Sequence, residues 1–150
     1  MEEPLVKIHY WLYPISWIYG MGVRLRNKLF DWGYYQSKSF DVPVVCIGNL
    51  AVGGTGKTPH TEYLIKLLQQ TGTNVAMLSR GYKRKSKGYI LATEETDVKR
   101  IGDEPYQIKN KFPAIRVAVD ENRCHGIEQL MKLDHPKVDV VLLDDAYQHR

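Results

Sequence analysis

Residues 42–58 read VPVVCIGNLAVGGTGKT. The first seven are apolar and mostly β-branched, which is typical of a strand covered on both faces of a sheet. Three glycines, Gly53, Gly54 and Gly56, then form a turn, and Thr58 opens a helix. The stretch therefore predicts a strand, a glycine-rich loop and a helix in succession, which is the arrangement of a phosphate-binding loop.

The loop AVGGTGKT fits the Walker A pattern with alanine in place of its first glycine. Its glycines carry no Cβ, so the main chain can approach a phosphate closely, and the helix N-terminus adds a partial positive charge. We expect Lys57 to reach the β- and γ-phosphates of ATP and the Thr58 hydroxyl to bind Mg²⁺. A chance glycine turn is the alternative, and the flanking strand and helix argue against it. The predicted nucleotide-binding residues are Ala51, Val52, Gly53, Gly54, Thr55, Gly56, Lys57 and Thr58.

A second apolar run, VDVVLLDD at 138–145, ends in two carboxylates. Parallel α/β sheets bind ligands beyond the carboxyl ends of their strands, and Mg²⁺ prefers hard oxygen ligands. We therefore expect Asp144 to bind the metal, directly or through water. Asp145 either shares the ion or faces the acceptor of the phosphate. The alternative is an acidic turn that only ends a strand.

The rest of the chain alternates between strand and helix patterns. Further strands are expected at 74–79, 88–93, 114–119 and 138–143, and further helices at 103–110 and 121–133. In the helix after the loop, Tyr63, Leu64, Leu67 and Leu68 should share the buried face, with Gly72 as the cap. This alternation predicts an α/β fold of the P-loop NTPase type with a mostly parallel, doubly wound sheet.

The first 32 residues differ from this core. No Asp, Glu, Lys or Arg occurs from Ile8 to Val23, where tyrosines and tryptophans are frequent, and basic residues follow directly. The run is shorter than the ~20 apolar residues of a membrane-spanning helix, but it suits an amphipathic aromatic helix lying in the membrane interface. The alternative is a helix packed on the domain's own core or on another domain. We therefore predict an interface helix in residues 1–32 and a nucleotide-binding core in residues 33–150.

Composition narrows the remaining function classes. The formal net charge of +4 over 150 residues is mild and predicts no nucleic-acid binding. Cys46 and Cys124 lack the paired spacing of a zinc site, which favours a reducing compartment. A GTPase is disfavoured because no Asn-Lys-x-Asp motif occurs. Partner-regulated membrane ATPases carry a lysine at the position of Val52 and are disfavoured as well.

Five stretches together resemble the lipid A 4'-kinase (tetraacyldisaccharide 4'-kinase) family. They are VPVVCIGNL followed by VGGTGKTP, SRGYKRK (79–85), GDEP (102–105), VAVDENR (117–123) and DDAYQHR (144–150). The resemblance implies transfer of the ATP γ-phosphate to the 4'-hydroxyl of a lipid disaccharide at the cytoplasmic face of the bacterial inner membrane, as a step of lipid A biosynthesis. The family continues beyond DDAYQHR, so the chain could bind ATP without full kinase activity. A nucleotide-gated membrane-binding ATPase module is therefore the alternative function.

The resemblance also implies roles for individual residues. Asp103 is the candidate base that takes the proton of the acceptor hydroxyl, and Lys57 and Asp145 complete the predicted catalytic set. Arg80 is expected to bind the acceptor's phosphate with Asp145 and His149 nearby. Each assignment has a plainer alternative: a helix cap for Asp103, a solvated charged loop around Arg80 and a structural role for His149.

Overall fold

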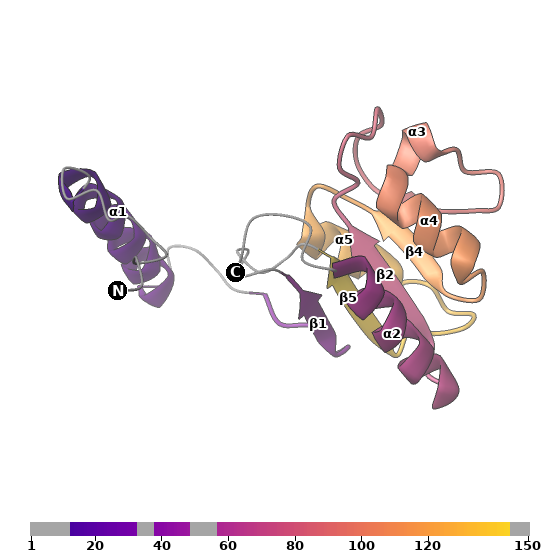
Figure 1. Cartoon of the computed structure of the whole chain (residues 1–150). Helices are drawn as coiled ribbons and strands as arrows, with labels where there is room; N and C mark the ends of the chain where they lie inside the picture. The colour runs from indigo at the N-terminus through magenta and orange to yellow at the C-terminus, as the bar shows by residue number, and fades with distance from the viewer. Residues whose placement is uncertain (1–12, 33–37, 49–56, 145–150) are drawn as a thin grey trace, which may run out of the picture. The chain divides into compact units, whose positions relative to one another are not determined.

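The computed structural model describes residues 13–32, 38–48 and 57–144 (Figure 1). The chain divides into two compact units, residues 1–38 and 39–150.

The first unit contains the helix α1 (Tyr13–Asp31). Most of its described apolar side chains are exposed, including Trp17 at 69% and Tyr19 at 75%. The basic residues of the helix come in its second half, at positions 24, 26 and 28. Among the described residues, no helix combines the length and the apolarity that crossing a bilayer requires.

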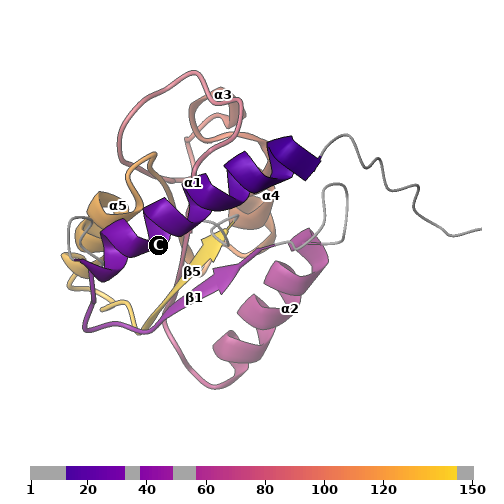
Figure 2. The same ribbon diagram turned by 90° about the vertical axis from the view of Figure 1, so that its left-hand side faces the viewer.

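The second unit is built on a five-stranded sheet with the order β1-β5-β2-β4-β3 (Figures 1 and 2). Strands β1, β5, β2 and β4 are parallel to one another, and β3 runs antiparallel to β4. The prediction of a mostly parallel sheet is confirmed. The strands are β1 (Val44–Ile47), β2 (Val75–Ser79), β3 (Ile90–Leu91), β4 (Arg116–Val119) and β5 (Val140–Asp144).

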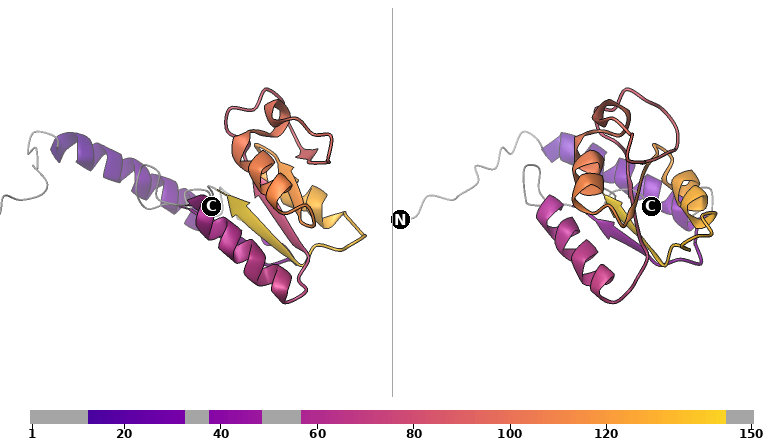
Figure 3. Two further views of the ribbon diagram at one scale, coloured as in Figure 1. Left: turned by 45° about the vertical axis from the view of Figure 1, so that its right-hand side comes forward. Right: turned by 90° about the vertical axis from the view of Figure 1, so that its right-hand side faces the viewer.

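Helices cover both faces of this sheet (Figure 3). Ile65 of α2 (Lys57–Gln70) and Ile108 of α4 (Asp103–Lys111) pack with Met77 on one face. On the other face, Ile127 of α5 (Arg123–Met131) packs with Leu78. Consecutive strand residues point to opposite faces, so β2 is apolar at the four successive positions 75–78, which alternate between the two faces. The sheet is therefore doubly wound, as predicted.

The buried face of α2 agrees only in part with the predicted one: Leu64 and Leu68 pack against the core, as expected. Thr61 and Ile65 are buried, whereas Tyr63 is 68% exposed and Leu67 is 45% exposed. The helix is turned so that the positions one turn apart at 61 and 65 meet the sheet, which leaves the predicted positions 63 and 67 on the outer side. The predicted cap is confirmed, because Gly72 has a φ of +75° and donates its N–H to the carbonyl of residue 69.

Two further elements differ from expectation. β1 is the end strand of the sheet, and Val45 is 39% exposed, so the prediction of a strand covered on both faces was wrong for this residue. An apolar run of this length does not distinguish a central strand from an edge strand. A short helix, α3 (Val98–Ile101), was not predicted, because a single turn leaves too few positions for a periodic pattern.

Candidate active site

The nucleotide-binding prediction requires that the strand before the Walker A residues and the strand before Asp145 end close together, at the carboxyl end of the sheet. β1 precedes the Walker A residues in the chain, and α2 begins with the last two of them, Lys57 and Thr58. β5 lies beside β1, with Asp144 in register with Ile47. The strand that precedes the Walker A residues therefore ends beside the strand that ends in Asp144, and Asp144 is only 5% exposed.

Arg123 holds this strand end from the other side of the sheet. It is the first residue of α5, and its guanidinium Nη2 donates a hydrogen bond of 3.0 Å to the backbone carbonyl of Asp144. The helix start is itself capped, because the Asn122 side chain accepts the N–H of His125. A hydrogen bond from a charged group to a buried carbonyl fixes the direction of the backbone at Asp144.

A second helix N-terminus lies next to that of α2. The Thr58 hydroxyl Oγ1 is 3.5 Å from the Glu104 carboxylate Oε1, within reach of a weak hydrogen bond. Further along the same two helices, Lys111 Nζ and Glu62 Oε2 form an ion pair at 2.6 Å. The Walker A helix and the GDEP helix therefore lie side by side, which the 46-residue separation of Thr58 and Glu104 could not predict.

Asp103 is the first helical residue of α4, and it is exposed. The N-cap position belongs to Gly102, and no side-chain hydrogen bond caps this helix. The cap alternative for Asp103 therefore does not describe its position. The Asp103 carboxylate lies at the N-terminus of α4, accessible from solvent.

At the start of this helix, the backbone of the SRGY stretch packs closely against the backbone of the GDEP stretch, and each segment has a glycine at the contact. Gly81 and Gly102 have φ values of +69° and +91°. A Cβ on Gly102 would lie 2.9 Å from the carbonyl oxygen of Tyr82, and one on Gly81 would lie 2.9 Å from that of Ile101. Only residues without a Cβ allow this approach. Arg80 directly precedes Gly81 and Asp103 directly follows Gly102, so the close approach of the two glycines brings the backbones at Arg80 and Asp103 near each other. Arg80 is exposed and follows the last residue of β2.

The predicted site residues therefore fall into two groups. Thr58, Arg80, Asp103 and Asp144 occupy element ends at one edge of the unit, and Lys57 begins α2. The loop residues Ala51–Gly56, together with Asp145 and His149, lie outside the described residues. Their roles, and those of the first group, stay predictions.

The prediction missed a buried carboxylate at the end of β4. Asp120 is 2% exposed, and it accepts hydrogen bonds from the N–H of Asn122 at 2.9 Å and from His125 Nδ1 at 2.7 Å. The Tyr89 ring lies edge-on to His125 at 6.3 Å, and burial is the main cause that raises the pKa of Tyr89. The signal was present in the sequence, since Asp120 directly follows an apolar strand, as Asp144 does.

Glu104 was also missed as an individual residue, although its GDEP motif was singled out. Glutamate in a first helical turn is explained by the helix dipole alone, so the sequence offers no reason to assign it to a site. Its proximity to Thr58 is the signal, and this is visible only once α2 and α4 are placed together.

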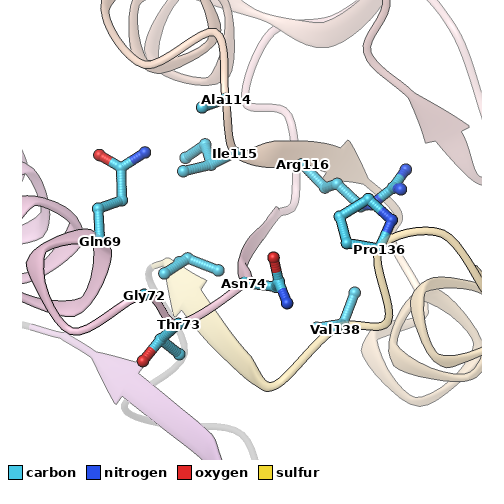
Figure 4. A pocket seen from close by; sticks show the side chains of 10 residues that line it. Gln69, Gly72, Thr73, Asn74, Ala114, Ile115, Arg116, Pro136 and Val138 are labelled. Atoms are coloured by element: carbon cyan, nitrogen blue, oxygen red, sulfur yellow. The ribbon is translucent and has the colours of Figure 1, made fainter.

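A pocket of about 200 Å³ lies at the opposite end of the sheet (Figure 4). It is lined by the first residues of β2 and β4 and by residues that precede β5. Ligands of open α/β sheets bind at the other end, beyond the carboxyl ends of the strands. This pocket is therefore not the nucleotide site. Its lining residues are Gln69, Gly72, Thr73, Asn74, Val75, Ala114, Ile115, Arg116, Pro136 and Val138.

Comparison with known proteins identifies a matching family. A family model described as "Tetraacyldisaccharide-1-P 4'-kinase" (LpxK) matches residues 8–150. A tetraacyldisaccharide 4'-kinase of Bacteroides fragilis is 71% identical over 150 residues, and one of Porphyromonas gingivalis is 53% identical over 151 residues. Each match includes all of this chain, but the chain spans about 40% of the length of these relatives.

A solved structure agrees with the sequence matches. The crystal structure of LpxK from Aquifex aeolicus in complex with ATP is similar to this chain with a TM-score of 0.76 and 41% sequence identity. The similarity covers 93% of this chain and 44% of the Aquifex chain.

Proposed function

Because the chain belongs to the tetraacyldisaccharide-1-P 4'-kinase family, we propose that it forms the ATP-binding part of a kinase. This kinase transfers the γ-phosphate of ATP to the 4'-hydroxyl of a tetraacyldisaccharide 1-phosphate, a step of lipid A biosynthesis. One observation supports the proposal most strongly. The strand before the Walker A residues pairs with the strand that ends in Asp144, and the helix after them starts beside the GDEP helix.

The nucleotide phosphates lie, in this proposal, between the N-termini of α2 and α4. Backbone amides of residues 51–58 and the dipole of α2 stabilise their negative charge. Lys57 reaches the β- and γ-phosphates. The acidic first turn of α4 repels phosphate oxygens, so a bound cation would be needed to neutralise the charge there.

The described residues fit Mg²⁺ in the chemistry of their donors. Thr58 supplies a hydroxyl, and Asp144 and Glu104 supply carboxylates, all of them hard oxygen ligands. Within the described ranges no three His, Cys, Asp or Glu side chains cluster, and a nucleotide Mg²⁺ needs only one or two carboxylates besides phosphate oxygens. Asp145 is the further ligand predicted by the sequence. The bound ion would neutralise charge on the transferred phosphoryl group.

Transfer then requires an acceptor hydroxyl in line with the γ-phosphate. The 4'-oxygen forms a bond to the γ-phosphorus while the bond to the β–γ bridging oxygen breaks, and ADP leaves. Asp103 accepts the proton that the hydroxyl loses. Arg80 binds the phosphate that the acceptor already carries, and His149 and Asp145 contribute to the same site.

The acceptor is a lipid, so the enzyme must work at a membrane. We propose that residues 1–32 bind the cytoplasmic face of the bacterial inner membrane. The exposed apolar side chains of α1 and the basic residues that follow them support this, because they match the acyl boundary and the anionic headgroups.

The test is transfer of labelled phosphate. The 150-residue chain is incubated with γ-³²P-ATP, Mg²⁺ and the acceptor lipid in mixed micelles, and labelled lipid is separated by chromatography. ATP binding is measured in parallel. We expect Lys57→Ala to weaken ATP binding at least tenfold, and Lys66→Ala, on the exposed side of the same helix, to leave it unchanged.

Three outcomes separate the candidate functions. Labelled lipid, lost in Asp103→Asn with ATP binding retained, supports the kinase. Nucleotide-dependent membrane binding without labelled lipid supports the membrane-binding module instead. Equal ATP binding by Lys57→Ala and the parent would refute both.

A further inference from the structure

We propose that the loop after β2 is a second membrane-docking surface, which binds anionic phospholipid headgroups in the plane of the bilayer. We call it the basic loop and define it as residues 80–88. It contains five cationic residues and no acidic ones: Arg80, Lys83, Arg84, Lys85 and Lys87. The proposal goes beyond the proposed function, which places the membrane contact in residues 1–32 and assigns only Arg80 to the acceptor.

The burial of the basic loop alternates in a way that separates its cations into two sets. Lys83, Lys85 and Lys87 are exposed, whereas Arg84 and Ser86 between them are partly buried. Tyr82 precedes them and is 77% exposed, with Lys83 Nζ 5.2 Å from the centre of its ring. The loop therefore presents three ammonium groups and one aromatic ring on its outer side.

The inner set fixes this arrangement. The Arg84 side chain is only 3% exposed, and its guanidinium bonds Glu121 at 2.7 Å and the carbonyl of Gly88 at 2.9 Å. Glu121 in turn accepts the N–H of Gly88 at 2.9 Å. Arg84 and Glu121 thus close the loop on itself, so little conformational entropy is lost when the outer side meets a surface.

The basic loop is also bound to α3. The N–H of Lys85 donates to the carbonyl of Lys99 at 2.9 Å, and the Ser86 hydroxyl donates to the carbonyl of Arg100. In Figure 1 the pink segment that follows β2 runs beside α3. The loop is therefore anchored by both its backbone and its inner side chains.

Two rival interpretations fit these observations less well. A pocket for a single phosphate needs converging, partly buried donors, whereas within the described ranges the three lysines form no ion pair and are exposed. A merely solvated charged loop does not explain an anchoring buried arginine or an exposed tyrosine beside the lysines. An extended layer of phosphates with a shallow apolar boundary requires exposed cations and an aromatic ring.

The experiment compares vesicle binding of three forms of the full chain. Lys83, Lys85 and Lys87 are changed together to Gln in the loop variant. A control variant carries Gln at Lys66, Lys132 and Lys137, which are exposed elsewhere on the unit and change the net charge equally. Binding without nucleotide is measured by co-sedimentation with vesicles of phosphatidylethanolamine containing 30% phosphatidylglycerol, and with vesicles of phosphatidylcholine alone.

We expect the loop variant to bind the anionic vesicles about 10- to 100-fold more weakly at low salt, since each lysine near an anionic surface contributes roughly fivefold. The control should lose less than threefold, and neither variant should change binding to phosphatidylcholine. The difference should disappear at 0.5 M salt, where exposed charges are screened. Circular dichroism and the urea midpoint verify folding, and unchanged ATP binding shows that the nucleotide site is intact.

Tyr82→Ala provides a second test of the same surface. Because the ring acts through its apolar area, we expect a two- to fivefold loss of binding to the anionic vesicles that persists at high salt. Equal losses in the loop and control variants would mean that only net charge matters. Undiminished binding of the loop variant would mean that residues 1–32 make the whole contact, and either result would overturn the proposal. Both results would leave the kinase proposal standing, because vesicle binding is measured without transfer.

Discussion

Gly102 is the residue on which the position of Asp103 depends most directly. Its φ of +91° is unfavourable for any residue with a Cβ, and the space for that Cβ is already occupied by the carbonyl of Tyr82. Gly72 has a similar φ of +75° but nothing within 4 Å of the added atom. A substitution at Gly72 therefore tests backbone strain alone, whereas one at Gly102 tests backbone strain together with steric crowding.

We expect Gly102→Ala to lower the free energy of unfolding by about 2–4 kcal/mol and Gly72→Ala by about 1 kcal/mol. The larger effect reflects the forced separation of the two crossing loops. Urea unfolding measures both values. Phosphate transfer should fall in Gly102→Ala more than the unfolded fraction explains, because Asp103 is displaced. Equal stability losses in the two variants would show that the crossing loops separate at no cost.

Glu104 and Glu62 both reach from one helix of the α2–α4 pair to the other, but in different surroundings. Glu104 lies 3.5 Å from Thr58 at the predicted metal end, while Glu62 pairs with Lys111 further along the helices. We expect Glu104→Gln to raise the Mg²⁺ concentration needed for half-maximal ATP binding about tenfold, because a carboxylate ligand is lost. Glu62→Gln is the matched control and should cost at most about 1 kcal/mol of stability.

Titration of ATP binding with Mg²⁺, followed by fluorescence of a labelled nucleotide, measures this requirement. A similar shift in both variants would mean that helix packing, rather than the carboxylate at position 104, determines the metal dependence.

At the scale of single elements, the strands were predicted more accurately than the helix faces. The run VVLLD is buried at every position, and its place along the chain follows from its apolar composition. In α2, apolar residues occur at 63, 64, 65, 67 and 68, which covers more than one face. The choice between Ile65 and Leu67 is made by the sheet that the helix meets, and no pattern within the helix contains that information.

The ion pair that closes the basic loop should respond to pH. Burial alone would raise the pKa of the Glu121 carboxyl, but the N–H groups of Glu121 and Gly88 and the charge of Arg84 together lower it. A carboxyl whose folded pKa is lowered stabilises the fold above its unfolded pKa, near 4.3, and this contribution is lost as the pH falls through the folded pKa. The Glu121 side chain is 46% exposed, so the contribution is at most about 1 kcal/mol.

We therefore expect Glu121→Gln to be less stable than the parent by about 0.5–1 kcal/mol at pH 7, and the difference to shrink as the pH falls below the unfolded pKa, near 4.3. Urea unfolding at pH 7, 5 and 3.5 measures the difference. A gap that stays constant over this range would show that Glu121 acts through packing or hydrogen bonding and not through its charge.

For the whole molecule, the alternation of strand and helix patterns was sufficient to predict a doubly wound sheet. The order of its strands was not predictable. β5 is inserted between β1 and β2, so the strand that ends in Asp144 pairs with residues almost a hundred positions earlier. Register across such distances depends on side-chain packing in the assembled core. This pairing sets the end of β1, the strand before the Walker A residues, beside Asp144, so the Walker A and Asp144 predictions are consistent with each other.

The proposed interface helix can be tested through its exposed side chains. Trp17 and Tyr19 of α1 are 69% and 75% exposed, and Tyr63 and Leu67 of α2 are 68% and 45% exposed. If exposed aromatic and apolar side chains bind membranes wherever they occur, both pairs should matter. If residues 1–32 form a dedicated interface helix, only the pair in α1 should contribute to membrane binding. An aromatic ring can reach the headgroup level only when its helix lies at the membrane surface.

We expect Trp17→Ser with Tyr19→Ser to weaken binding to phosphatidylcholine vesicles about tenfold, at low and at high salt, and Tyr63→Ser with Leu67→Ser to leave it unchanged. Deleting residues 1–32 should abolish this salt-independent binding and leave only the weaker, salt-sensitive binding of the basic loop to anionic vesicles. Partitioning measured by co-sedimentation distinguishes the two components. A deletion variant that still binds phosphatidylcholine as tightly as the parent would move the apolar contact from α1 to the nucleotide-binding unit.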